Sequence, residues 1–341
     1  MAFGLNKKAI IKFFILIVLL ISLVVISFKL SPYPSAWIIR HAFDKEAEKV
    51  NIALEKHVPK NITSKLDIIY NPNDSDAKLD LYFPENKNDS MPIIIWTHGG
   101  GWISGNKSQI GNYCKILASN GFVVASIDYS IAPENNYPKP VAQLNEALGF
   151  LHKNAKKYAI NSNQFFLAGD SGGSHIAAQV ATIITSEAYA EKMQIQPAIP
   201  KKDLAGMLLY CGPFDTQKVN LNGDFGVFLK TVLWSYSGDK NFMENQNFKT
   251  ASVINYVTKD FPPTYISVGN ADPLETHSKE LANKLENLNV AVERLFFEAE
   301  YEPKLPHEYQ FNLETEAGKT ALKKSITFCK QTIASRKTTQ D

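Results

Sequence analysis

The chain has 341 residues, enough for one large α/β domain or two small ones. Its formal net charge is +2 with both signs mixed along the chain, so no phosphate-binding surface is indicated and nucleic acid is not an expected partner. The three cysteines are far apart and lack C-x-x-C spacing, which argues against a disulfide framework and a zinc site. We expect buried or incidental thiols, and we expect no metal.

An apolar stretch without charges, residues 13–28, lies near the N-terminus, with three lysines before it and Lys29 after it. Sixteen residues give about 24 Å of helix, short of a ~30 Å hydrocarbon core, but flanking lysines can lengthen the span. We predict an uncleaved membrane anchor over 1–30. Since the lysines concentrate on its N-terminal side, that end is expected in the cytoplasm and the rest of the chain outside it. Secretion after cleavage of a signal peptide is the alternative, although no clean cleavage site follows the stretch.

Residues 31–60 hold an amphipathic helix, whose apolar positions fall largely on one face between 36 and 58. Such a stripe needs a surface to pack on. Two roles remain open for it: a structural prop against the core, or a cap element that forms part of a lid over an active site.

The next segments have the patterns of strands. Residues 66–70 and 78–83 alternate like half-buried antiparallel strands around a turn-rich segment, which predicts an edge hairpin. Residues 92–97 are continuously apolar, as expected of a strand covered on both faces. This strand leads directly into H-G-G-G-W at 98–102.

A second motif lies at 164–175, where Q-F-F-L-A-G-D-S-G-G-S-H turns from a buried strand into a helix at Ser171. In this setting G-x-S-x-G is a nucleophile elbow, and Ser171 is the candidate nucleophile. G-D-S-G-G also surrounds the serine of trypsin-like proteases, which are all-β. The alternation of strands and helices in this chain favours an α/β fold instead.

The glycines of the first motif have a functional interpretation as an oxyanion hole. Backbone N–H groups of Gly99, Gly100 and Gly101, together with that of Gly172 after the serine, are the expected donors to an oxyanion. Two alternatives are a simple tight turn and a phosphate loop, whose lysine would stand one residue from the required position.

The motifs H-G-G-G-W, D-Y-S-I-A-P-E at 128–134 and G-D-S-G-G resemble the hormone-sensitive-lipase-like branch of the α/β-hydrolase fold. The resemblance covers roughly 65–335. It implies a mostly parallel central sheet flanked by helices, in a catalytic domain over 61–341 with a helical cap insertion at about 213–251. In that family the middle motif supports the oxyanion loop, and Ser130 replaces its usual arginine.

The resemblance also implies the rest of a catalytic triad. Family members carry the acid in a D-P-L segment after a strand, which here gives Asp272, and His307 completes the order serine, acid, histidine. The family usually reads H-G-F at the histidine, whereas this chain has H-E-Y. Other acids and histidines fit less well, and Asp170 is interpreted as structural. The rival acids are Asp215, Glu298 and Glu300, and the rival histidines include His175 and His277.

These features imply a carboxylic ester hydrolase that works through an acyl-enzyme and needs no cofactor. The expected partner is a small-molecule ester, and the aromatic cap segment suits an apolar acyl group. A serine peptidase or amidase on the same fold, and a membrane-anchored binding module without turnover, are the alternatives. The acyl length and the oligomeric state stay open.

Overall fold

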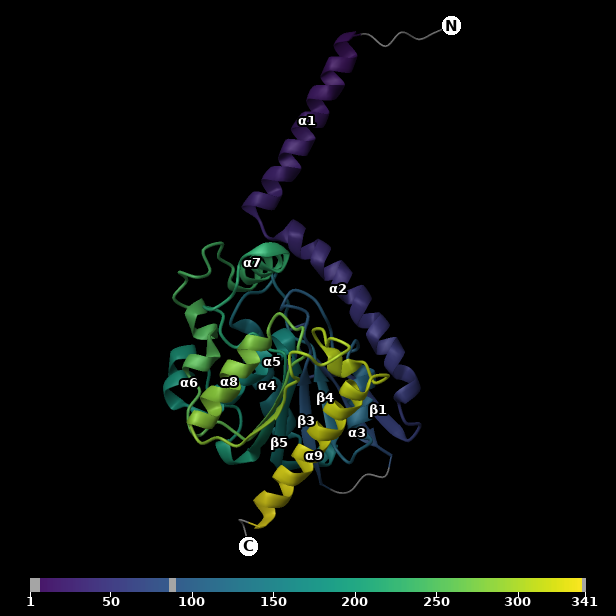
Figure 1. Cartoon of the computed structure of the whole chain (residues 1–341), viewed down its shortest axis with the longest axis vertical. Helices are drawn as coiled ribbons and strands as arrows, with labels where there is room; N and C mark the ends of the chain where they lie inside the picture. Colours follow the sequence, from purple (N-terminus) through teal and green to yellow (C-terminus); the bar gives the residue numbers. More distant parts are fainter. Residues whose placement is uncertain (1–6, 86–89, 339–341) are drawn as a thin grey trace.

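The computed structural model describes residues 7–85 and 90–338 of the chain (Figure 1). Residues 1–6 of the predicted anchor, and residues 86–89 and 339–341 of the predicted catalytic domain, lie outside the described residues. Helix α1 (Lys7–Leu30) projects from an α/β domain, and helix α2 (Tyr33–Leu54) runs from its base down one side of that domain.

Helix α1 is longer than the uncharged stretch suggested. Its apolar window extends over 21 residues, Ile10–Leu30, and none of this window is buried against the domain. At 1.5 Å per residue these residues span about 32 Å, close to the thickness of a hydrocarbon core. The sequence estimate was too short because it ended at the lysines, whereas the helix includes Lys12 and Lys29. By length and composition α1 can cross a membrane, and a signal sequence would have the same properties.

The domain contains an eight-stranded sheet in the order β1-β2-β4-β3-β5-β6-β7-β8. The first two strands form the predicted antiparallel hairpin at one edge, and β2 also pairs antiparallel with β4, while the other pairings are parallel. The predicted mostly parallel sheet is therefore confirmed. The strands are β1 (Ile62–Ile69), β2 (Lys78–Pro84), β3 (Met91–Thr97), β4 (Val123–Ile127), β5 (Ile160–Asp170), β6 (Leu204–Tyr210), β7 (Thr264–Ser267) and β8 (Val292–Leu295).

Helices cover both faces of this sheet. Along β5, Phe165 and Leu167 pack into one apolar cluster with α4, α5, α6 and α8, whereas Phe166 and Ala168 pack into a second with α3 and α9. Side chains of a strand alternate between faces, so a strand apolar at every position must be covered on both. These helices are α3 (Gly111–Ala118), α4 (Lys139–Lys153), α5 (Ser171–Thr185), α6 (Glu187–Met193), α8 (Glu275–Asn287) and α9 (Glu316–Thr338).

Helix α7 (Gly223–Ser237) lies within the predicted cap segment, at the end of the domain from which α1 emerges (Figure 1). Both α2 and α7 line one cavity with the loops that follow β3 and β5. Helix α2 is therefore part of the cavity wall, as expected if residues 31–60 serve as a cap element.

One arginine holds α2 against these loops. Arg40 donates from Nε to the carbonyl of Ile103 at 2.6 Å and from Nη2 to that of Ala132 at 2.8 Å, and its guanidinium pairs with Glu134. Its side chain is only 22% exposed. A guanidinium with several charge-assisted bonds in such a place fixes position strongly, so Arg40 sets where α2 lies relative to the site.

Replacing Arg40 by alanine should lower the free energy of unfolding by about 2 kcal/mol, because charged hydrogen bonds to two backbone carbonyls and a carboxylate are lost. Urea unfolding of the full chain in detergent measures this change. Lys49→Ala is the matched control on the same helix, since its exposed pair with Glu46 should contribute less than about 0.5 kcal/mol. Equal effects of the two substitutions would contradict the assignment.

Candidate active site

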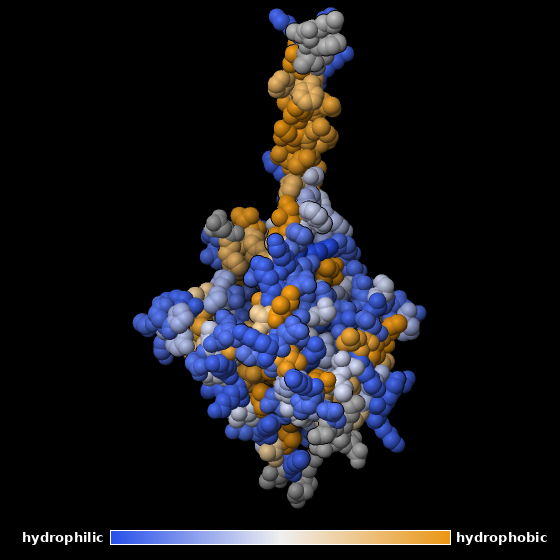
Figure 2. All heavy atoms as spheres, turned by 90° about the vertical axis from the view of Figure 1, so that its right-hand side faces the viewer, coloured by the Kyte–Doolittle hydropathy of each residue, from blue (hydrophilic) through white to orange (hydrophobic). Residues whose placement is uncertain are grey.

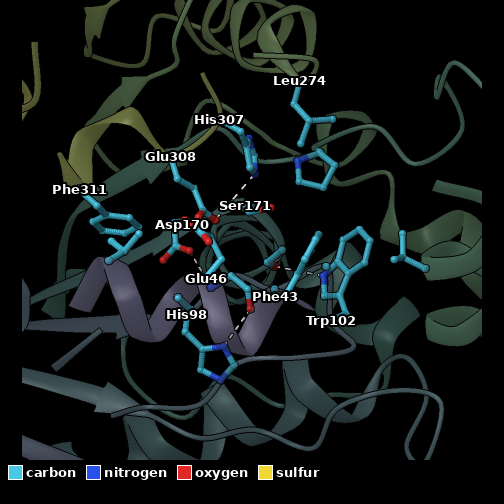
Figure 3. A pocket seen from close by; sticks show the side chains of 18 of the residues that line it. Phe43, Glu46, His98, Trp102, Asp170, Ser171, Leu274, His307, Glu308 and Phe311 are labelled. Carbon is cyan, nitrogen blue, oxygen red and sulfur yellow. Dashed lines mark hydrogen bonds and ion pairs between the residues drawn. The ribbon is translucent and has the colours of Figure 1, made fainter. Parts of the chain in front are cut away.

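The turn between β5 and α5 has the strained geometry of a nucleophile elbow. Ser171 is the first residue of α5 and has φ +48°, a left-handed conformation that serine rarely adopts. The turn is packed so closely that a Cβ on Gly173 would overlap the carbonyl oxygen of Thr97 at the end of β3. Small residues are therefore required here, as the sequence motif predicts, and Ser171 lines the cavity (Figure 3).

In the glycine loop after β3, Gly99 differs from Gly100 and Gly101 in what its backbone N–H contacts. Gly100 and Gly101 have φ +96° and +59°, and within the described chain neither donates its N–H to a protein acceptor. The N–H of Gly172 lies in the first turn of α5, where a helix has no acceptor of its own. Gly99 differs, because its N–H donates to Asp170 Oδ2 at 2.8 Å. This corrects the expectation for Gly99: its N–H holds the loop to the elbow and is not free for an oxyanion.

The segment 128–134 supports the glycine loop, as the resemblance implied. Tyr129 donates its hydroxyl to the carbonyl of His98 at 3.0 Å, and its ring stacks on that of His98. Ser130, at the position where the family usually has arginine, donates its hydroxyl to Asp76 Oδ2 at 2.7 Å and accepts from Gln143. The serine thus belongs to a buried network behind the loop.

His307 and Asp272, which come from separate loops, are brought together. His307 Nδ1 lies 2.8 Å from Asp272 Oδ2, and Asp272 Oδ1 accepts from the N–H of Leu274 at 2.8 Å. The carboxylate side chain is fully buried, and the imidazole is 32% exposed on the cavity side. This contact fixes the ring, so that Nε2 is the nitrogen left for the cavity that Ser171 also lines (Figure 3).

The surroundings of His307 favour its protonated form. Burial opposes the charge, but the hydrogen-bonded Asp272 carboxylate raises the pKa of the imidazole above its ordinary value. Burial also raises the pKa of the Cys211 thiol to about 11. At neutral pH this thiol is therefore uncharged, and Asp272 is the negative charge that stabilises an imidazolium.

Sequence reasoning did not connect Cys211 with this site. It follows β6 and is buried, and its Sγ lies within 4.8 Å of the donor atoms of Asp272 and His307. Three such donors have the spacing of a metal site. The short His307–Asp272 contact already uses one donor of each residue, and the thiol is protonated at neutral pH, so these residues fit a hydrogen-bonded pair better than a metal centre.

A further carboxylate, that of Glu308, was also missed. Its Oε1 lies 3.8 Å from His307 Nε2, and its backbone has φ +59°. This is the position where the family usually has glycine, which adopts such a φ without strain. Burial raises the pKa of the Asp170 carboxyl well above its usual range, and the nearby Glu308 raises it further. The departure from H-G-F was the only signal in the sequence.

The rival residues lie elsewhere. His175 is buried, with Nε2 2.7 Å from the carbonyl oxygen of Ala251, and burial lowers its pKa to about 4. The N–H of Asp215 donates to His277 Nδ1 at 3.3 Å, and no hydrogen bond joins either residue to His307 among the described residues. Glu298 and Glu300 are exposed. Asp170 accepts hydrogen bonds from backbone and indole, in keeping with the structural role expected for it. All three cysteines are free and buried, as predicted.

The cavity has a volume of about 500 Å³. Phe43 and Val50 of α2 and Phe228 and Val232 of α7 form much of its apolar wall. Its lining includes the carboxyl groups of Glu46, Asp170 and Glu308, and among the described lining residues none is lysine or arginine.

Comparisons with known proteins agree with this architecture. The BD-FAE family model matches residues 79–285. A mimivirus protein (Acanthamoeba polyphaga mimivirus) named as α/β hydrolase R526 is 26% identical over 227 residues, 64% of this chain and 62% of its own length. An esterase of Gibberella moniliformis is 27% identical over 210 residues, 59% of this chain and 63% of its own length. The chain thus matches less than two thirds of either relative.

Among solved structures, esterase B of Lactobacillus rhamnosis superposes with a TM-score of 0.77 at 23% identity. The alignment covers 91% of this chain and 98% of that one. A likeness of this extent shows the same α/β-hydrolase fold.

The titration of His307 tests the geometry without any substrate. Nitrogen-15 NMR of the full chain should find an imidazole pKa above that of free histidine, and Asp272→Asn should lower it because the stabilising charge is lost. Asp215→Asn is the matched control, since the charge of the Asp215 carboxylate acts on His277 and its removal should leave the titration of His307 unchanged. An unchanged pKa in the Asp272 variant would contradict the pairing.

Proposed function

This chain belongs to the BD-FAE family of α/β-hydrolases, and on that premise we propose that it hydrolyses carboxylic esters through Ser171, His307 and Asp272. The observation that carries the proposal is the arrangement in one cavity. A strained serine, a histidine oriented by a buried carboxylate and glycine N–H groups without acceptors line the same space. These are the components that acyl transfer requires.

Each component has one role in the reaction. His307 Nε2 takes the proton of Ser171 Oγ as this oxygen attacks the ester carbonyl carbon, and Asp272 stabilises the imidazolium. The N–H groups of Gly100, Gly101 and Gly172 hold the negative oxygen of the tetrahedral intermediate. Collapse of the intermediate returns the proton to the departing alcohol and leaves an acyl-enzyme.

Water then hydrolyses the acyl-enzyme through the same steps. His307 takes a proton from the attacking water, a second tetrahedral intermediate forms at the same glycine loop, and the acid leaves as Ser171 recovers its proton. The raised pKa of His307 has a consequence for pH. Because only the neutral imidazole accepts a proton, kcat/KM should rise with pH through this raised pKa.

The cavity indicates the kind of ester. Its walls are mainly aliphatic and aromatic, which supports an uncharged substrate with an apolar acyl group. Esterase B of Lactobacillus rhamnosis has also been solved with a tributyrin phosphonate inhibitor, and this supports an ester substrate for a chain of the same fold.

We further propose that α1 anchors the enzyme as a single membrane-spanning helix. Its length and its exposed apolar surface support this assignment. Lysines at its N-terminal end support a cytoplasmic location for that end, with the α/β domain on the other side of the membrane. Cleavage as a signal peptide is the alternative, and the mass of the mature N-terminus distinguishes the two.

Ser171→Ala should reduce kcat/KM for p-nitrophenyl butyrate by at least about 10⁴, because no other group supplies the nucleophile. A fluorophosphonate should label Ser171, and peptide mass mapping identifies the labelled residue. Ser174→Ala is the matched control, because this buried hydroxyl in the same helix has no hydrogen-bond partner among the described residues. Full turnover in a clean Ser171→Ala preparation would refute the mechanism, and much faster cleavage of matched amides would favour a peptidase.

The carboxylates of the cavity should make the enzyme select on charge. An ester whose alcohol carries a carboxylate should have a kcat/KM about tenfold below that of an uncharged ester of the same shape, since Glu308 lies close to where the alcohol leaves. Glu308→Gln should bring the kcat/KM values of the two esters closer together, while kcat/KM for the uncharged ester changes little. The test is to measure kcat/KM for both esters with the native chain and with the variant. An unaltered ratio between the two esters would exclude Glu308 as the cause of the charge selectivity.

A further inference from the structure

Exposed apolar side chains on the domain concentrate in one region. Outside α1, the described residues expose nine large apolar side chains. Six of these lie in the first half of α2 or near the start of α7, and we call them the apolar rim. The rim consists of Tyr33, Trp37, Ile38, Phe43, Phe225 and Val227.

The rim is at the end of the domain where the anchor emerges. Helix α2 begins three residues after α1 ends, and Lys240, which follows α7, donates from Nζ to the carbonyl of Lys29 at 3.0 Å. Figure 1 places α7 and the start of α2 beside the base of α1, and Figure 2 shows apolar surface next to that base. The side chains of Trp37 and Val227 are 68% and 63% exposed. Exposure of such large apolar side chains to water is unfavourable, so a surface that covers them would be stabilising.

The rim is continuous with the wall of the catalytic cavity. Phe43 and Phe225 belong to both, since each lines the cavity and is also partly exposed. Phe228 lies between them, with ring centroids 5.4 Å from Phe43 and 5.5 Å from Phe225. An apolar path of side chains therefore leads from the anchored end of the domain into the cavity that holds Ser171.

We propose that the apolar rim docks on the bilayer surface beside α1 and that the cavity takes its ester substrate from the bilayer. The substrate class is then an amphiphilic lipid ester without net negative charge at the scissile end. The bilayer is the expected partner of the rim because a helix that crosses a membrane would hold the six adjacent side chains at the membrane–water interface. This inference rests on the proposed ester hydrolysis and on the proposed role of α1 as an uncleaved anchor.

The test uses the full chain in phosphatidylcholine nanodiscs with two substrates. One is water-soluble p-nitrophenyl butyrate, and the other is a diacylglycerol dissolved in the same bilayer. The double variant Trp37→Glu/Val227→Glu should lower diacylglycerol turnover by at least about tenfold, because two charges replace apolar groups at the interface. Turnover of p-nitrophenyl butyrate should stay within about twofold of native, since neither residue lines the cavity.

The matched control is Ile52→Glu/Leu66→Glu. It adds the same charge at side chains that are 59% and 58% exposed but lie outside the rim. Both turnovers should stay near native in the control. Equal diacylglycerol turnover in the two double variants would overturn the proposal, and so would a loss on both substrates in the rim variant alone, which would indicate a damaged active site. A native chain inactive on p-nitrophenyl butyrate would instead refute the proposed function.

Docking itself has a readout that needs no turnover. Brominated phosphatidylcholine should quench the fluorescence of Trp37. The fraction of tryptophan fluorescence that this lipid quenches should therefore be smaller in Trp37→Phe than in the native chain. No quenching difference between the two chains would show that the rim faces water or another protein, and the proposal would fail.

Discussion

The candidate site depends on one buried carboxyl group, that of Asp170. It accepts from Trp96 Nε1 at 2.7 Å and from the N–H of Gly99 at 2.8 Å, and it is itself the residue before the nucleophile. These bonds join the loop after β3 to the turn after β5. Removing the acceptor would leave two buried donors unpaired, at about 1–3 kcal/mol for each. With Gly99 held in this way, the next two glycines line the same cavity as Ser171, and their N–H groups have no acceptor among the described residues.

The same junction explains why a strained serine is tolerated. A left-handed conformation at a non-glycine residue costs on the order of 1–3 kcal/mol and persists only where its surroundings impose it. Here Gly173 packs directly on the backbone of β3, and Trp102 donates from its indole to the carbonyl of Gly172 at 3.1 Å. The Trp102 ring in turn stacks on Tyr236 of α7, so the elbow, the glycine loop and the cap segment constrain one another.

The sequence predicts the parts of this site that depend on neighbouring residues. The elbow at Ser171 and the strand before it follow from small residues and an apolar run, both local patterns. Asp272 and His307 came only from family resemblance, because their meeting depends on how two distant loops close. Cys211 was missed for the same reason, and a free N–H at Gly99 was wrongly expected because the buried Asp170 acceptor has no local signature. The uncharged stretch 13–28 is shorter than α1 because lysines also occur inside the helix, which lies wholly within the predicted anchor segment 1–30.

Helix α2 connects the proposed anchor, α1, to the wall of the cavity. Helix α2 starts where α1 ends, lines the cavity, and is fastened by Arg40 to the carbonyls of Ile103 and Ala132. Ile103 lies in the loop that also carries Gly100 and Gly101, so the bond from Arg40 fixes α2 relative to the glycine loop. Because α2 cannot rotate on the domain without breaking these bonds, its side chains keep a fixed position in the cavity wall. The proposed anchor is thus joined to the domain through a helix that also forms part of the cavity wall.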